Sequence, residues 1–477
     1  MQPDPAIQGK KRTIPMSISA VEREGKKQSI LGRATAVSVY LFEKVMPDPF
    51  VFAVLLTFVG ALLALEFAPN ATVSSVASAW YGGVFVIFAF AFQMVIMLVA
   101  GYALAIAPPV QKLLAKIASS VSTPLAAISL TIVVSMVASW INWGLGLVTA
   151  ALLAREMAKR VKVDFGWLVA AAYTGFVIST EGLSGSIALS QATHGSALNI
   201  VEKVTGHGLP LNETVFTRFN LIPCALLLIL LPIIFRALQP TERNTVVADP
   251  ERLRKEDQEV HLRERENTLG SKLDHAWILN LLLATFGVFA LVIQWHRSGF
   301  SLDLNSVIIM LVLGGLLLHW RPVAYVGAIR RAARISGSLI LQYPLYGGLM
   351  GIITTTGLAA VLSKVFIHFS TARTLPFFTY LTSMIITLFV PSGGGHWAVQ
   401  GPFAVPAAQS LHSSLAATTM SVAMGESVAN MLQPFWALPI LAIAGIKMRR
   451  MMGFMVVTFV VSAVVFGLSL LFLVPLQ

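Results

Sequence analysis

The chain has 477 residues, of which 56% are hydrophobic and only 12% are charged, and its formal net charge is +12. Soluble domains average about 25% charged residues, so this composition excludes an ordinary soluble protein. The positive balance is typical of cytoplasmic loops rich in Lys and Arg, and it does not call for nucleic acid as a partner.

The N-terminal residues differ from the rest of the chain. Residues 1–35 are polar and basic and lack the apolar core of a signal peptide, so we expect a disordered cytoplasmic tail. Apolar runs long enough to cross a bilayer follow. They include Phe50–Phe67, Val84–Ala107, Phe219–Phe235, Ala276–Trp295 and Phe454–Val474. The sequence therefore predicts an all-α polytopic membrane protein with about nine spans and two hairpins.

The charges of the loops set the expected topology and domain limits. Clusters of Lys and Arg occur at 112–116, 155–162, 321–334 and 447–450, whereas 69–81 and 412–415 carry no charge. Because basic loops face the cytoplasm, we expect the N-terminus inside and the C-terminus outside the membrane. The charged segment 239–274 is expected to be a cytoplasmic linker between an N-terminal repeat, 36–238, and a C-terminal repeat, 275–477.

Two segments are too short for two spans, yet each begins and ends on one side of the membrane. Segment 124–154 carries the polar tip Ser139–Gly146, and segment 376–411 carries the tip Pro391–Trp397. Three glycines and a proline continue a helix only at a cost, about 1 and 3 kcal/mol per residue respectively. We therefore expect two re-entrant hairpins of opposite orientation.

An interrupted span follows each hairpin. Gly166–Leu189 is broken near Thr180–Ser186, and Ala416–Ala444 is broken near Asn430–Pro434. Broken helices at matching places in inverted repeats indicate a transporter binding site. Positions 250 residues apart correspond in the two halves, namely Asn142 with Ser392 and Gly175 with Gly425.

The four broken elements are expected to converge and form one site. Helix N-termini suit a carboxylate, and freed carbonyl and hydroxyl groups suit Na⁺ or another hard cation. These segments contain no Lys or Arg, which favours a small monoanion over a dicarboxylate or a phosphate. Aromatic side chains near the breaks either wall an apolar substrate tail or pack the helices.

Three ionisable residues have alternative interpretations. Glu426 and Glu181 each either couple a cation or proton or form structural hydrogen bonds. His396 binds substrate, titrates, or packs as a neutral side chain. The sequence has no P-loop, HExxH or GxSxG motif, so we expect neither an ATP motor nor an enzyme, and no cofactor apart from a coupling ion.

Several motifs together carry a family resemblance over residues 36–477. They are Pro47-Asp48-Pro49, Ile141-Asn142-Trp143-Gly144, Val390 to Trp397, Gln400-Gly401-Pro402-Phe403 and Gln433 to Pro439. The chain resembles the bacterial short-chain fatty acid transporters, part of a broader ion-transporter superfamily. The resemblance implies uptake of acetoacetate, butyrate and related acids, a homodimer, and an elevator mechanism with a scaffold and a moving domain.

The leading hypothesis is cation-coupled symport of short-chain monocarboxylates. The alternatives are a proton-coupled or exchange carrier for other small organic anions and a passive anion channel. The predicted substrate-binding residues are Asn142, Trp143, Gly144, Ser184, Ser392, Gly393, Gly394, Gly395, His396, Trp397, Gln433 and Pro434. The residues predicted to couple a cation or proton are Thr180, Glu181, Glu426 and Asn430.

Overall fold

The computed structural model describes residues 49–69, 71–240, 245–251, 253, 268–433 and 435–475. Every regular element in these ranges is helical, which confirms the predicted all-α class. The N-terminal half comprises α2 Pro49–Phe67, α3 Val73–Val86, α4 Phe88–Ala105, α5 Pro108–Ser119, α6 Pro124–Ile141, α7 Trp143–Ala158, α8 Phe165–Thr174, the 3-10 turn η2 Gly175–Ile178, α9 Ser186–Ala192, α10 Ile200–Thr205 and α11 Arg218–Ala237.

The C-terminal half repeats this arrangement after a short helix. It comprises α13 Leu269–Asp274, α14 Trp277–Ser298, α15 Leu304–His319, α16 Pro322–Ala333, α17 Gly337–Thr355, α18 Leu358–Phe369, α19 Leu375–Thr387, α20 Gly393–Ser410, α21 Leu415–Asn430, α22 Ala437–Ala444, the 3-10 turn η4 Met448–Arg450 and α23 Met452–Phe472.

Long apolar helices support a multi-pass membrane protein. In the described residues six helices are long and apolar enough to cross a bilayer, namely α2, α4, α6, α11, α14 and α23. A seventh span results if α17 and α18, bent by 76° at their junction, are taken together. The predicted number of nine spans stays a prediction.

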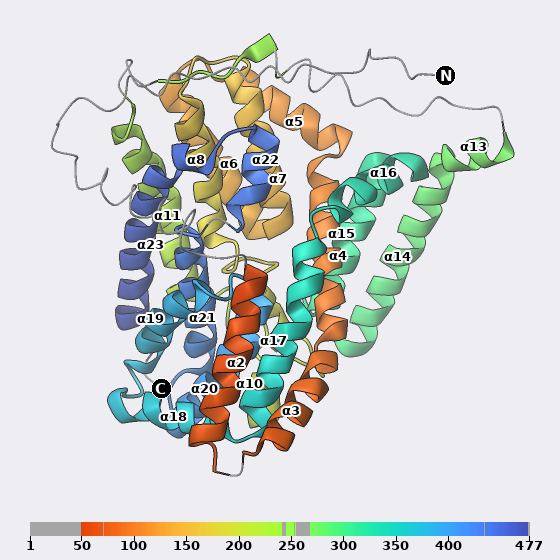
Figure 1. Cartoon of the computed structure of the whole chain (residues 1–477). Coiled ribbons are helices and arrows are strands. Elements are labelled where there is room, and N and C mark those ends of the chain that lie inside the picture. Colours follow the sequence, from red (N-terminus) through yellow and green to blue (C-terminus); the bar gives the residue numbers. More distant parts are fainter. Residues whose placement is uncertain are drawn as a thin grey trace, which may run out of the picture.

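The two halves are an internal repeat. The helix pairs α5 and α18, α7 and α20, and α8 and α21 each begin 250 residues apart. Side chains repeat too: Ser135 Oγ donates to the Ala172 carbonyl at 2.6 Å, and Ser383 Oγ donates to the Val422 carbonyl at 2.7 Å. In Figure 1, α6 and α7 lie in the upper part of the molecule and α19 and α20 in the lower part. The repeats are therefore inverted, as predicted.

The first hairpin is interrupted at a single residue. Asn142 ends α6 and begins α7, with extended backbone angles between two helices that pack closely together. The second arm runs to Ala158, a little beyond the predicted limit of 154. In the second hairpin, 388–392 separates α19 from α20, and α19 packs more extensively on α21 than on α20.

The glycine run of the second hairpin corrects one expectation. We predicted that these glycines interrupt the helix, but Gly393 to Gly395 form the first turn of α20. Close packing explains them, since an added Cβ would lie 2.1 Å from the Phe90 ring at Gly394 and 2.3 Å from the Tyr346 ring at Gly395. Glycine destabilises the helix here, but only glycine lets the Phe90 ring of α4 and the Tyr346 ring of α17 pack this closely against α20.

Both interrupted spans have the predicted form. Residues 179–185 separate η2 from α9, and residues 431–436 separate α21 from α22. The linker differs in part from the solvated segment that was expected. Its residue Val246 donates its amide to Asp164 Oδ2 at 2.8 Å and accepts from the Phe165 amide, and Leu253 is buried. The basic tail, residues 1–35, lies outside the described residues.

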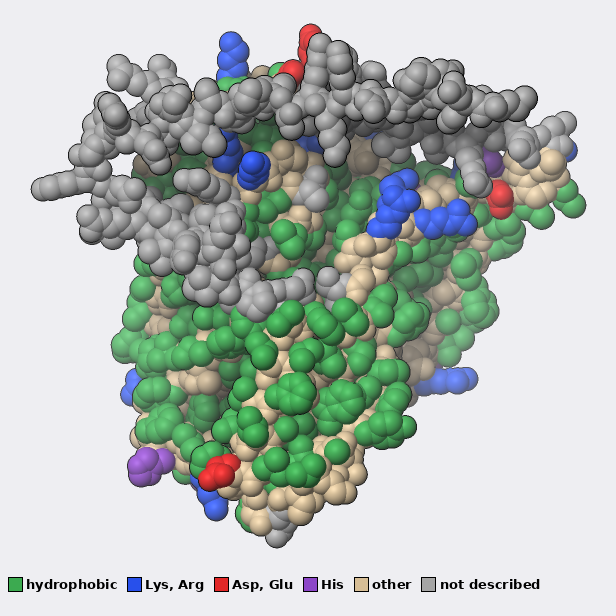
Figure 2. All heavy atoms as spheres, in the orientation of Figure 1, with side chains coloured by type: hydrophobic (Ala, Val, Ile, Leu, Met, Phe, Trp, Pro, Cys, Tyr) green, Lys and Arg blue, Asp and Glu red, His purple; other side chains and the backbone are tan. Residues whose placement is uncertain are grey.

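The helices form two groups that pack against each other. The first group is α2–α5 with α14–α18, and the second group is α6–α11 with α19–α23. They meet where α4 and α5 pack on α7, and where α17 and α18 pack on α20. Lys and Arg gather at the end of the molecule that carries α5 and α16, and hydrophobic side chains cover the middle of the visible face (Figure 2).

Candidate functional site

The two hairpin tips and the two helix breaks lie against one another, as predicted. The Leu183 amide donates to the Trp140 carbonyl at 2.8 Å, so the first break touches the first tip. Trp436 Nε1 donates to the Pro391 carbonyl at 2.7 Å, which joins the second break to the second tip. Thr180 Oγ1 donates to the Ala423 carbonyl at 2.9 Å and links the two repeats.

A small cavity lies where these elements meet. Its volume of ≈ 30 Å³ admits water-sized occupants and is smaller than a short-chain acid. It is lined by Met94, Trp143, Phe176, Ser179, Thr180, Gly185, Ser186, Leu339, Tyr343, Ser392, Gly393, Glu426 and Trp436. None of these described lining residues is Lys, Arg or His, as expected for a site without a cationic clamp.

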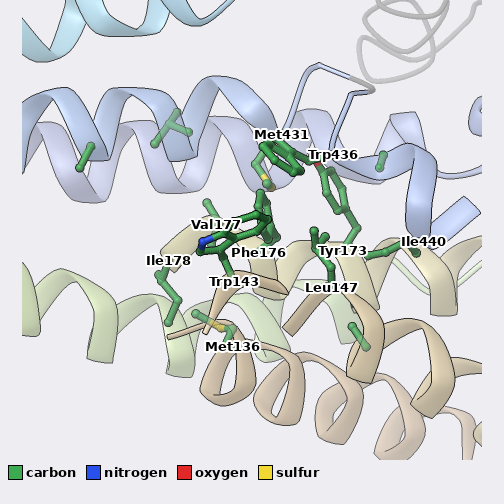
Figure 3. Packing of buried hydrophobic residues seen from close by; sticks show 14 of the residues in the cluster. Met136, Trp143, Leu147, Tyr173, Phe176, Val177, Ile178, Met431, Trp436 and Ile440 are labelled. Atoms are coloured by element: carbon green, nitrogen blue, oxygen red, sulfur yellow. The ribbon is translucent and has the colours of Figure 1, made fainter. Parts of the chain in front are cut away.

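Aromatic rings form the apolar side of the cavity. The rings of Trp143 and Trp436 meet edge to face with centroids 5.2 Å apart, and Phe176 lies 5.8 Å from Trp436. Figure 3 shows these rings together with Met431 and Leu147 within the buried core. Edge-to-face pairs add about 0.5–1.5 kcal/mol beyond their buried area, so this wall is well ordered.

The N-terminus of α20 forms the polar side. The Ser392 side chain does not cap the helix, and its hydroxyl donates to the Tyr343 hydroxyl at 3.1 Å. The first amides of a helix have no partner within the helix. No described residue accepts from the amides of Gly393, Gly394 or Gly395. This end of α20 therefore has hydrogen-bonding capacity and a positive dipole for an anion.

The equivalent N-terminus of α7 already has side-chain acceptors for two of its first amides. Asn142 Oδ1 accepts from the Leu145 amide at 2.8 Å, and Ser184 Oγ accepts from the Trp143 amide at 2.9 Å. Asn142 and Ser184 lie outside the cavity wall, although both are buried. Gly144 lets α7 approach α4, since an added Cβ would lie 3.0 Å from the Leu98 carbonyl. Here the two inverted hairpins differ.

Glu426 brings a carboxyl group to the polar side of the cavity. It is 2% exposed, its Oε1 accepts from Asn430 Nδ2 at 3.5 Å, and its Oε2 has no hydrogen-bond partner among the described residues. A Cβ added at Gly393 would lie 3.1 Å from that Oε2, so the carboxyl group faces the start of α20. A buried charge without a partner is costly, which makes this oxygen a place for a proton or a cation.

Glu181 lies in a satisfied network outside the cavity wall. Its Oε2 accepts from Ser427 Oγ at 3.0 Å, and its Oε1 accepts from Thr180 Oγ1 at 3.0 Å. Its carbonyl accepts from Asn220 Nδ2 at 2.9 Å. These contacts join the first break to α21 and α11. Of this network only Thr180 also lines the cavity.

The other predicted residues lie behind the cavity. His396 bonds through Nδ1 to Thr387 Oγ1 at 3.1 Å and through Nε2 to Gln400 Oε1 at 2.6 Å, all buried. Trp397 Nε1 donates to the Leu198 carbonyl at 2.9 Å. These contacts are those expected of packed side chains.

The C-terminal end of α21 holds further polar groups. The Asn430 carbonyl accepts from the Tyr173 hydroxyl at 2.8 Å. The side-chain oxygens of Asn430 and Gln433 are buried without a hydrogen-bond partner among the described residues. Pro434 lies outside the described residues.

Sequence reasoning missed three wall residues from the first helix group. Met94 lies on α4, and Leu339 and Tyr343 lie on α17. The only signal for them is Pro344 within an apolar helix beside a tyrosine. Tyr343 stacks edge to face on Phe90, with centroids 5.9 Å apart, which holds its hydroxyl toward Ser392.

Comparison with known proteins places the chain among transporters. The family model described as short chain fatty acid transporter matches residues 30–473. Candidate short-chain fatty acid transporters of Escherichia coli K12 and Haemophilus influenzae Rd are 37% and 35% identical to it, covering 92% and 93% of this chain and 99% and 100% of the relatives. The crystal structure of the Alcanivorax borkumensis YdaH transporter, at 16% identity, covers 88% of this chain and 98% of its own, with a TM-score of 0.55. That last likeness concerns the fold alone.

Proposed function

The chain belongs to the short chain fatty acid transporter family, and on that premise we propose that it carries short-chain monocarboxylates by cation-coupled symport. One observation carries the proposal. Gly393, at the uncapped start of α20, lines the same small cavity as Glu426, whose Oε2 has no hydrogen-bond partner among the described residues.

The acid would lie with its ends in two different environments. Its carboxylate would bind the amides of Gly393 and Gly394 and the hydroxyl of Ser392, and its alkyl chain would pack on Trp143 and Trp436. The amide hydrogen bonds favour the anion, and the rings favour a short apolar tail. Acetoacetate and butyrate fit this chemistry, whereas a second carboxylate would meet the aromatic wall.

Coupling follows from the charges in the cavity. The substrate carboxylate and Glu426 would share a space whose described wall has no Lys, Arg or His. Two carboxylates in so small a cavity repel each other unless a proton or a cation lies with them. A symported ion at Glu426 removes that repulsion. The side-chain oxygens of Asn430 and Gln433, which lack partners among the described residues, are further candidate ligands near the end of α21, and Thr180 and Glu181 are candidates on the facing break.

The cavity must enlarge before an acid fits. Its wall combines residues of both helix groups, with Met94, Leu339 and Tyr343 from the first group and the remaining lining residues from the second. Sliding of the second group along α4 and α17 would open this space toward one side of the membrane and then the other. We propose such an elevator movement in a homodimer in the bacterial inner membrane, with the N-terminus inside and the C-terminus outside.

Reconstituted uptake tests this function. Purified protein in proteoliposomes is assayed with radiolabelled acetate, butyrate, acetoacetate and succinate under an imposed Na⁺ or pH gradient. We expect saturable, gradient-driven accumulation of the monocarboxylates and little uptake of succinate. Absence of accumulation under both gradients would contradict symport.

A proton-coupled carrier is the second candidate, because the buried Glu426 carboxyl group also suits a cycle in which a proton, rather than Na⁺, accompanies the anion. Accumulation that follows the pH gradient and is indifferent to Na⁺ would favour proton coupling. Counterflow of labelled butyrate against preloaded unlabelled butyrate separates a carrier from a passive channel, since a channel gives high flux without counterflow.

A further inference from the structure

A second, larger cavity adjoins the substrate cavity. It has a volume of ≈ 360 Å³ and shares two wall residues, Leu339 and Trp436, with the substrate cavity. Both shared side chains are nearly buried, with 3% and 8% of their surface exposed. The two spaces are therefore neighbours that share this residue pair as a wall.

The larger cavity lies toward the basic end of the molecule. It is lined by the start of α17, the end of α16, and α22, which contributes Leu438, and its deep wall includes Leu147 of α7. Arg334 ends α16, is exposed, and is the one cationic residue of its described lining. Arg334 forms no ion pair with any described residue. Apolar walls beside one cation match the two ends of a short fatty acid anion.

Only the larger of the two cavities has the volume of a small-molecule pocket. Pockets for small molecules measure about 300–1,000 Å³, a range that includes the larger cavity but not the substrate cavity. In this conformation a four-carbon acid therefore fits the larger cavity but not the substrate cavity, and Leu339 and Trp436 form the wall that the two share. Trp436 is held in place by its hydrogen bond to the Pro391 carbonyl and by Trp143.

We propose that the larger cavity is a vestibule that holds a second monocarboxylate anion at Arg334, and that Leu339 and Trp436 form the gate between it and the substrate cavity. The proposal rests on the proposed transport of short-chain acids. Arg334 raises the local concentration of the anion at the basic end, which is the cytoplasmic end in the proposed topology, and movement of the gate side chains admits it to the substrate cavity.

The vestibule predicts a one-sided effect of Arg334. In oriented proteoliposomes, the half-saturating butyrate concentration is measured separately from each side for wild type, Arg334→Gln and Arg334→Lys. Two unit charges about 4 Å apart in water interact by about 1 kcal/mol, so Arg334→Gln is expected to raise that concentration about fivefold at the basic end. The other side should not change, and Arg334→Lys should behave like wild type.

Salt supplies an internal control. The effect should largely vanish at 1 M salt, where the screening length is about 3 Å. An equal effect on both sides, or no effect at low salt, would overturn the proposal. If wild-type protein transports no butyrate, the proposed function fails instead, so the two failures are distinguishable.

A labelling experiment tests occupancy directly. Cys224 is the single cysteine of the chain and is buried in α11, so Cys224→Ala provides a background without thiols. Leu438→Cys in the vestibule should react with an anionic methanethiosulfonate, and butyrate should slow that reaction. The control is Val326→Cys on α16, outside the vestibule lining, where the native side chain is 45% exposed. Butyrate should not change the rate at which this cysteine is labelled. Equal protection of both cysteines, or of neither, would contradict an anion held in the vestibule.

Discussion

The substitution Gly393→Ala tests the site at the atom where the substrate carboxylate is proposed to bind. An alanine Cβ would lie 2.3 Å from Ser186 Oγ and 3.1 Å from Glu426 Oε2. Overpacking of this kind costs about 1–3 kcal/mol. If crowding of the same size opposes the bound carboxylate, butyrate affinity falls roughly fivefold to 150-fold.

The folded state should tolerate the same change. Alanine is better than glycine in a helix by about 1 kcal/mol, which offsets part of the strain in α20. We therefore expect the thermal unfolding temperature in detergent to change by a few degrees at most, while uptake falls sharply. Initial rates of labelled butyrate uptake, taken over a range of concentrations, give the Michaelis constant and the maximal rate.

Two matched variants make the reasoning refutable. Gly82→Ala in α3 adds a methyl group with nothing within 4 Å and should transport like wild type. Ser186→Ala removes the hydroxyl nearest the new Cβ, so it should restore part of the uptake in the Gly393→Ala background. Wild-type kinetics for Gly393→Ala, or no restoration by Ser186→Ala, would refute the proposed crowding at the start of α20.

The residues behind the cavity give further predictions. Ser427→Ala removes a hydrogen-bond donor to Glu181 in a buried network. We expect the protein to lose about 1–3 kcal/mol of stability, which is measured as a lower unfolding temperature. The Michaelis constant for butyrate should not change. A large rise in that constant would instead place Glu181 in the binding step. His396→Asn should lower the unfolding temperature and leave the pH profile of uptake unchanged, because both ring nitrogens of His396 are bonded within the hairpin. A shifted profile would show that His396 titrates during transport.

The broad architecture could be predicted because it follows from strong local signals. Glycine, proline and polar residues within apolar runs show where helices end in a membrane. The side from which each hairpin enters stays a prediction from the loop charges. The 250-residue spacing of Asn142 and Ser392 was correct in structural terms, since both residues begin the second arm of a hairpin.

The finer roles depended on contacts that sequence spacing does not encode. Gly394 and Gly395 were interpreted as helix breakers, yet they seat the rings of Phe90 and Tyr346 from distant helices. Tyr343 could be identified only from its hydrogen bond with Ser392, a residue 49 positions away in the sequence. A substrate cavity built between two helix groups necessarily draws on helices whose own sequences look like ordinary spans.

The symmetry of the repeat also hid a difference. Matching positions predicted two equivalent helix ends for a carboxylate, but Asn142 caps α7 whereas Ser392 leaves α20 uncapped. The Ser392 side chain is directed to Tyr343, to which its hydroxyl donates, and it accepts from no amide at the start of α20. Tertiary context at a single side chain thus decides which end is available to an anion.

The most direct test of coupling at the substrate cavity is Glu426→Gln, assayed for both gradient-driven accumulation and counterflow of butyrate in the same proteoliposomes. Glutamine keeps the shape and the contact with Asn430 but carries no charge. We expect counterflow to persist while accumulation driven by the Na⁺ or pH gradient is lost. Accumulation equal to that of wild type would contradict a coupling role for Glu426.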